Sequence, residues 1–101
     1  MNRIFYYDDV TQNLFAEEDA EETFLEELVD ELYGLADDDI SYVGIISNTN
    51  DKYKIKSDAY DSYKIYKFDV SKCDYIMIDL VDFEKVKMFL ESFFNKVVQN
   101  S

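Results

Sequence analysis

Between residues 41 and 81 the chain alternates apolar and polar side chains, and clusters of Ser, Asn and Asp interrupt the alternation at short intervals. Alternation with a period of two is typical of a strand that buries one face. The strand-like segments span residues 41–47, 52–56, 63–70 and 75–81. The links between them are too short for a crossover between parallel strands, so this region predicts an antiparallel meander.

Two of these segments carry a further signal. Residues 52–56 read Lys-Tyr-Lys-Ile-Lys, which places Lys52, Lys54 and Lys56 on one face. We interpret these lysines as a sheet edge or solvent face that opposes strand-to-strand aggregation. Anion or nucleic-acid binding is the alternative, and a net charge of −13 argues against it through long-range repulsion. In segment 63–70 the alternation slips in phase near Tyr66.

Two helical patterns flank the meander. Residues 17–35 predict a helix, with Asp19 and Glu22 resembling a capping box and Gly34 fitting a left-handed cap. Its apolar side chains recur with the spacing of one helix face and are Phe24, Leu25, Leu28, Val29, Leu32 and Leu35. Asp82 is the predicted N-cap of a second amphipathic helix that continues to about Val98.

The first 15 residues complete the expected order. Residues 2–7 are aromatic and contain Ile, as in a strand, and residues 8–15 are expected to form a connection. The chain therefore predicts a single α+β domain over residues 1–101 with the order β-α-β-β-β-β-α. About five antiparallel strands form its sheet, and both amphipathic helices cover the apolar face of that sheet.

The charge is divided unevenly along the chain. Residues 1–40 contain fourteen acidic groups and one basic group, Arg3, whereas residues 41–101 contain nine acidic groups and nine lysines. The whole excess of −13 therefore lies in the first 40 residues. Such asymmetry indicates a charged interaction surface.

The acidic excess supplies the candidate binding residues. On the predicted first helix, carboxylates recur at i and i+4 on the face opposite the apolar stripe, and an acidic turn follows the helix. Like charges at this spacing destabilise a helix by about 0.2–0.5 kcal/mol per pair, and a row of them resembles the charge spacing of a phosphate backbone. The alternative is a solvated face that keeps the protein soluble. The candidate residues are Glu22, Glu26, Glu27, Asp30, Glu31, Asp37, Asp38 and Asp39.

The sequence contains few of the residue combinations that active sites use. The chain has no His, a single Cys (Cys73) and two Gly that form no phosphate-binding loop. Asp37 and Asp39 begin a partial match to a calcium-binding loop, but Tyr42 stands where that loop requires Gly. We therefore expect no enzyme activity, no cofactor and no metal site.

In bulk features the chain resembles phage-encoded anti-defence proteins, such as anti-CRISPR proteins and DNA mimics, which are small, acidic and single-domain. Residues with AT-rich codons also greatly outnumber those with GC-rich codons, as expected for a low-GC bacterium or its phages. The resemblance implies an inhibitor that occupies a basic nucleic-acid-binding effector. The alternatives are an immunity protein or antitoxin against a basic nuclease toxin, and a structural or regulatory subunit whose acidic face is only solvated.

The sequence also sets expectations for surroundings and partners. It contains neither a signal peptide nor an apolar run of membrane-spanning length, so we expect a cytoplasmic protein of a bacterial host cell. Its partner is expected to be a basic protein, with no direct binding to nucleic acid or membrane. The oligomeric state stays open at this point.

Overall fold

The alternating segments form one antiparallel sheet in the computed structural model, which describes residues 1–58 and 61–94. In that part of the chain the strands lie in the order β2-β1-β4-β5-β6-β7, and β3 pairs with β1 beside β2. The elements are β1 (Arg3–Asp8), β2 (Asn13–Phe15), the 3-10 helix η1 (Glu17–Asp19), β3 (Glu21–Glu22), α1 (Leu25–Tyr33), β4 (Tyr42–Ile46), β5 (Lys52–Asp58), β6 (Ser62–Asp69), β7 (Asp74–Asp82) and α2 (Phe83–Glu91).

The α+β class and the antiparallel meander are thus confirmed, with a few more strands than expected. The slip near Tyr66 is confirmed as a β-bulge, because Ile65 pairs with Asp79 whereas Tyr66 pairs with Met77. Ile78 is therefore the extra residue on β7. Neither helix in residues 1–58 and 61–94 is long and apolar enough to cross a membrane.

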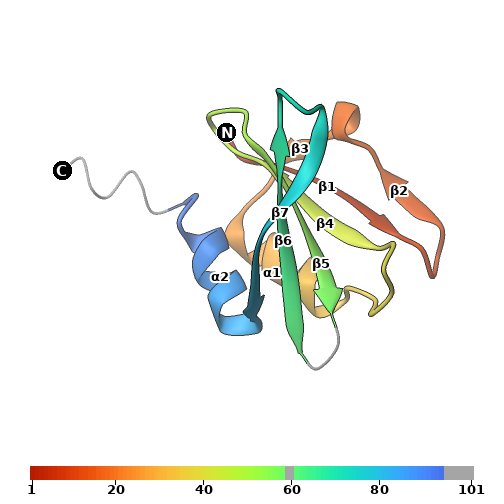
Figure 1. Cartoon of the computed structure of the whole chain (residues 1–101). Helices are drawn as coiled ribbons and strands as arrows, with labels where there is room; N and C mark the ends of the chain where they lie inside the picture. Colours follow the sequence, from red (N-terminus) through yellow and green to blue (C-terminus); the bar gives the residue numbers. More distant parts are fainter. Residues whose placement is uncertain (59–60, 95–101) are drawn as a thin grey trace.

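Both helices cover the same face of the sheet (Figure 1). Leu28 and Leu32 of α1 meet Val86 and Leu90 of α2 over the centre of the sheet, and all four are fully or almost fully buried. Four strands contribute buried residues to this core, in a row across the sheet: Ile4 of β1, Val43 and Ile45 of β4, Ile55 of β5 and Ile65 of β6. This is the core that the two apolar stripes predicted.

The first helix is shorter than the sequence predicted. Residues 17–24 do not belong to α1, because residues 17–19 form η1 and residues 21–22 form β3. Thr23 follows β3 and is buried, and its backbone N–H donates to the carbonyl of Asn2 at 2.9 Å. The proposed capping box of Asp19 and Glu22 is wrong, because the N-cap is Phe24 and no side chain caps it. Five carboxylates within residues 17–22 would repel one another on a continuous α-helix, whereas here Glu21 and Glu22 are extended and paired with β1, apart from the three on η1.

Two further sequence predictions about boundaries need correction. Gly34 ends α1, but its φ of −89° is not left-handed. Residues 13–15 of the expected connection form strand β2, which pairs with Tyr6, Tyr7 and Asp8. Asp82 is confirmed as the N-cap of α2, since its carboxylate accepts the Lys85 backbone N–H at 3.0 Å. The helix ends at Glu91, and residues 95–98 of the predicted helix lie outside the described residues.

The lysines of β5 do not lie on a sheet edge. Strand β5 lies between β4 and β6, in the interior of the sheet, and Lys52, Lys54 and Lys56 are half-buried on the face opposite the helices. The edge interpretation was therefore wrong, because strand order is not readable from one strand's pattern.

On that second face, Phe5 is fully buried and its ring lies directly over Gly44, its cross-strand neighbour on β4. A Cβ at Gly44 would overlap the ring atoms of Phe5. Glycine is therefore required here for close approach, since any side chain would displace a ring that has no free space around it.

We expect Gly44→Ala to lower the free energy of unfolding by about 1–3 kcal/mol, the usual effect of overpacking a buried site. Gly34→Ala is the matched control, because the nearest atoms to its added Cβ are 3.9 Å away. That change should be neutral or stabilising by up to about 1 kcal/mol. Urea unfolding followed by circular dichroism measures both, and equal effects of the two substitutions would contradict the close-approach explanation.

Candidate functional site

The eight predicted carboxylates do not form one surface. Glu26, Glu27 and Asp30 are exposed on α1, and Glu22 is exposed on β3. Asp37 and Asp39 are exposed in the loop between α1 and β4, beyond the opposite end of the helix. The predicted helical row that began at Glu22 is therefore wrong in geometry, because Glu22 belongs to an extended segment.

Asp38 is a structural residue. Its carboxylate accepts hydrogen bonds from the backbone N–H groups of Ile40 and Ser41, at 2.9 and 2.6 Å, and from the Ser41 hydroxyl at 3.0 Å. The bond from the Ser41 backbone is the main cause that holds the pKa of Asp38 below its ordinary value. The carboxylate stabilises the turn that leads into β4, so Asp38 is not part of the candidate binding surface.

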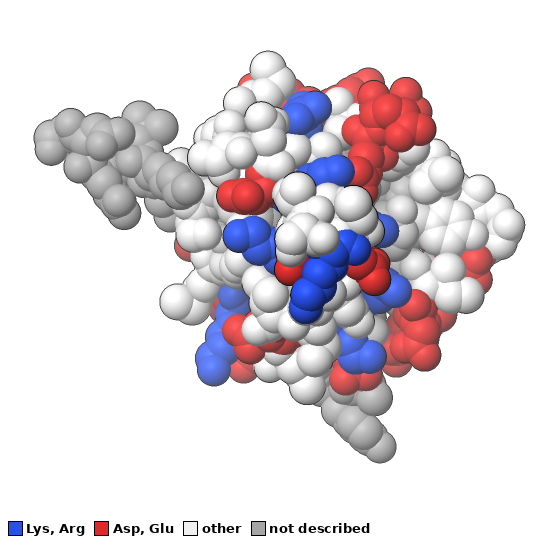
Figure 2. All heavy atoms as spheres, turned by 45° about the horizontal axis from the view of Figure 1, so that its top comes forward, with Lys and Arg blue, Asp and Glu red and all other residues white. Residues whose placement is uncertain are grey.

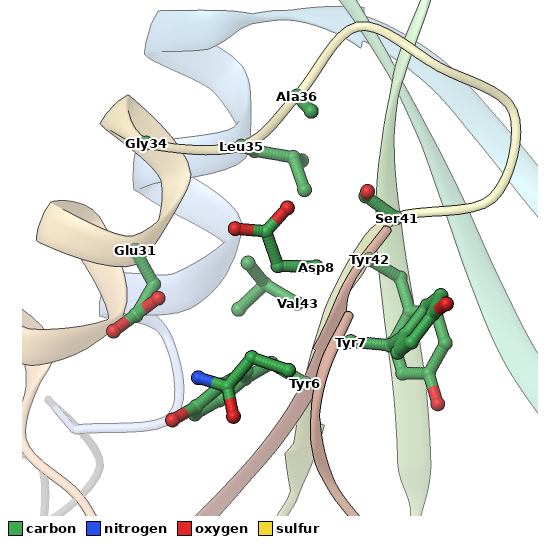
Figure 3. Close-up of a pocket in the computed structure, with 11 residues that line it drawn as sticks. Tyr6, Tyr7, Asp8, Glu31, Gly34, Leu35, Ala36, Ser41, Tyr42 and Val43 are labelled. Carbon is green, nitrogen blue, oxygen red and sulfur yellow. The ribbon is translucent and has the colours of Figure 1, made fainter. Parts of the chain in front are cut away.

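Glu31 is half-buried, unlike the other acidic residues of α1. It lines a pocket of about 120 Å³ between α1 and the β1–β4 pair, together with Asp8 (Figure 3). Burial, followed by repulsion from Glu27, Asp30 and Asp8, raises the pKa of Glu31. The Asp8 carboxylate accepts from the Val10 backbone and the Thr11 hydroxyl, so it is held by its own turn. The pocket is small, and Tyr6, Tyr7 and Ser41 line it beside the two carboxylates.

Exposed carboxylates follow one another along the chain in η1, β3 and α1. We call this group the acidic surface, and it consists of the exposed residues Glu18, Asp19, Glu21, Glu22, Glu26, Glu27 and Asp30. In residues 1–58 and 61–94, the ion pairs are Lys52–Glu17 and Lys64–Asp58, and neither includes a residue of this surface. Sequence reasoning missed Glu18, Asp19 and Glu21, although their place in the acidic run was visible.

The lysines are engaged elsewhere. Lys52 Nζ lies 2.9 Å from Glu17 Oε2 and 4.5 Å from the centroid of the Phe68 ring. Lys54 Nζ lies between two rings, 4.2 Å from the centroid of Tyr42 and 4.3 Å from that of Tyr75. Burial lowers the pKa of Lys54. These contacts attach the lysines to the sheet by cation–π attraction, so they are not free to neutralise the acidic surface.

Glu17 connects the acidic segment to this lysine-bearing face. Its Oε1 accepts from the Tyr75 hydroxyl at 2.6 Å while its Oε2 pairs with Lys52, so one carboxylate bridges β5 and β7. Burial alone would raise the pKa of Glu17, but the hydrogen bonds from Tyr75 and Lys52 outweigh it and hold that pKa below 4.5. Burial, followed by the same hydrogen bond to Glu17, raises the pKa of Tyr75 well above its ordinary value.

Figure 2 tilts the top of Figure 1 toward the viewer and shows how acidic and basic side chains are separated on that face. The largest groups of acidic side chains lie along its right-hand margin, whereas basic side chains lie mostly across the middle. A pocket of about 370 Å³ opens over the lysine face, lined by Tyr42, Tyr66, Tyr75 and two lysines among others.

Comparison with protein-family models, with curated proteins and with solved structures finds no match to this chain.

We expect Glu17→Gln to lower the free energy of unfolding by about 1 kcal/mol at pH 7, the size of a partly exposed charged hydrogen bond. Because the folded-state pKa is lowered, the contribution of Glu17 is present at neutral pH and is lost as the pH falls through that pKa. The deficit of the variant should therefore disappear well below pH 4.5. Urea unfolding at several pH values measures it.

Glu18→Gln is the matched control for this experiment. Glu18 is the exposed neighbour of Glu17 and lies on the same 3-10 helix. Its substitution should change stability by less than about 0.5 kcal/mol, as for an ordinary surface position. A deficit of Glu17→Gln that persists in acid would mean that the bridge does not depend on the ionised carboxylate.

Proposed function

We propose that this chain is an inhibitory binding protein without catalytic activity, whose acidic surface occupies the nucleic-acid-binding surface of a basic protein. The observation that carries the proposal is the acidic surface itself: seven exposed carboxylates on consecutive elements, outside every ion pair of the described residues. Their mutual repulsion opposes folding, and a cationic partner would relieve it.

The spacing of the carboxylates favours a groove that evolved for phosphates. Glu26 and Asp30 are one helical turn apart, which puts their Cβ atoms about 5–6 Å from one another. Phosphates along one DNA strand repeat about every 3.4 Å of helix axis. A line of lysines and arginines that tolerates a flexible phosphate backbone can also accommodate carboxylates at this interval, and the attraction would weaken as salt rises.

The setting that fits such an inhibitor is the cytoplasm of a bacterial host. An inhibitor of this kind, encoded by a phage or mobile element, would act there on a CRISPR effector, a restriction enzyme or a comparable nucleic-acid enzyme. An immunity protein that neutralises a basic nuclease toxin would use the same surface, and only the partner differs. The experiment must therefore identify the class of partner as well as the surface.

The proposed function predicts inhibition of at least one enzyme in a defined panel: an RNA-guided Cas nuclease, a restriction endonuclease and a bacterial DNase toxin, all purified. Cleavage of a labelled DNA duplex is measured against protein concentration at several salt concentrations. Inhibition of the first or second enzyme supports an anti-defence role, whereas inhibition of the toxin alone supports the immunity role. Rising salt should weaken inhibition in either case.

Charge reversal tests whether the acidic surface makes the contact. Glu26→Lys/Asp30→Lys changes two exposed side chains of α1 that make no hydrogen bond within the described residues. It should weaken inhibition at least tenfold and flatten its salt dependence. The matched control is Glu84→Lys/Glu91→Lys on α2, which changes the net charge equally. Unchanged inhibition by the α1 variant, or equal losses in both variants, would contradict the proposed surface.

A further inference from the structure

Strand β7 is a long strand at the edge of the sheet. It spans nine residues and pairs with β6 on one side, and no strand of residues 1–58 or 61–94 pairs with its other side. Edge strands are normally protected by charged side chains, proline, bulges or short length, because their free N–H and C=O groups are a template for another strand. Three aspartates and the bulge at Ile78 give β7 part of this protection. Strand β7 has neither Lys nor Pro, and it is longer than the usual five to six residues or so.

The edge is also apolar at its centre. Met77, Ile78 and Leu80 are exposed by 51%, 52% and 52%, and Ile76 by 37%. Ile78 is the bulge residue, so it has no partner on β6. A bulge of this kind redirects the side chain of the extra residue. Four exposed large apolar side chains within five residues distinguish this strand from an ordinary solvated edge.

Space for incoming side chains adjoins the same stretch. A pocket of about 380 Å³ is lined by four apolar residues and by Lys67, Asp51 and Asp69; the apolar ones are Phe68, Val70, Ile76 and Ile78. Val70 is 78% exposed at the end of β6. Strand addition uses such a combination, in which main-chain pairing supplies affinity and pockets for alternate side chains supply specificity.

Acidic residues lie at both ends of the apolar stretch, and Asp79 lies within it. The carboxylates of Asp74 and Asp79 each accept the backbone N–H of the following residue, at 2.8 and 2.9 Å, and Asp82 caps α2. These bonds hold three negative charges at defined places along the strand. The three aspartates therefore specify which strand can pair there.

Charge opposes pairing of β7 with a second copy of this chain in the register centred on Ile78, the middle of the strand. Antiparallel self-pairing of β7 centred on Ile78 would place Asp74 of each copy opposite Asp82 of the other, and like charges directly opposite are destabilising. Each copy also carries a net charge of −13, which adds long-range repulsion. The charge pattern instead selects a foreign strand with basic residues at the complementary positions.

We propose that the free edge of β7 binds an extended segment of a partner protein as an added antiparallel strand, apolar in its middle and basic opposite Asp74, Asp79 and Asp82. In a nine-residue segment this places Lys or Arg at positions 1, 4 and 9, opposite Asp82, Asp79 and Asp74 in turn. The surface differs from the acidic surface in position and chemistry, so this inference goes beyond the proposed function and does not depend on it.

Selection from a displayed random nonapeptide library against the immobilised full chain tests the proposal. The enriched peptides should be β-branched or aromatic in the middle and basic near both ends. A synthetic peptide of the enriched sequence should shift the amide NMR signals of β7 and of residues 68–70. The same peptide with its basic residues changed to Glu should bind at least tenfold more weakly.

Variants locate the site and separate it from the acidic surface. Ile78→Lys should weaken peptide binding at least tenfold, whereas Met88→Lys, at a 65% exposed position on α2, should change it less than twofold. Glu26→Lys/Asp30→Lys should leave the β7 signal shifts in place even if inhibition is lost. The proposal is overturned if no basic-flanked peptide is enriched, if Ile78→Lys binds as well as the parent, or if sedimentation shows a dimer that Ile78→Lys abolishes.

Discussion

The bridge that Glu17 makes between Lys52 and Tyr75 connects η1 to strands β5 and β7. By joining β5 and β7 through one carboxylate, it holds η1 over the sheet face that the helices leave open. Residues 21 and 22 are then extended beside β1, and α1 begins only at Leu25. The acidic run that would have been the first turns of a helix becomes instead a surface segment at the margin of the sheet.

The same face explains why the negative charge stays uncompensated. Lys52 is paired with Glu17, Lys54 is held between two tyrosine rings, and Lys56 donates to the carbonyl of Asp39 at 3.0 Å. The three lysines of β5 are thus used on the sheet face. Because side chains fixed in this way cannot swing toward α1, the separation of charge along the sequence becomes a separation in space.

Two surfaces of different chemistry result. The acidic surface offers long-range attraction, which is weak per contact and sensitive to salt. The edge of β7 offers main-chain hydrogen bonds and apolar contact, which act at short range and specify a direction and a register. A basic partner could be steered by the first and fixed in place by the second, and the paired variants at α1 and β7 distinguish these two contributions.

The sequence by itself determined the strands of the meander, the core faces of both helices, the N-cap at Asp82, the bulge near Tyr66 and the acidity of the first 40 residues. Each of these depends on local periodicity or on counting charge, so neighbours along the chain are sufficient to reveal them. Only the tertiary structure decided where α1 begins, that β5 lies inside the sheet, that Asp38 and Glu31 leave the acidic surface, and that β7 is a free apolar edge. The reason is physical: strand order and contacts such as Glu17 with Tyr75, 58 residues apart, join residues that no local pattern relates.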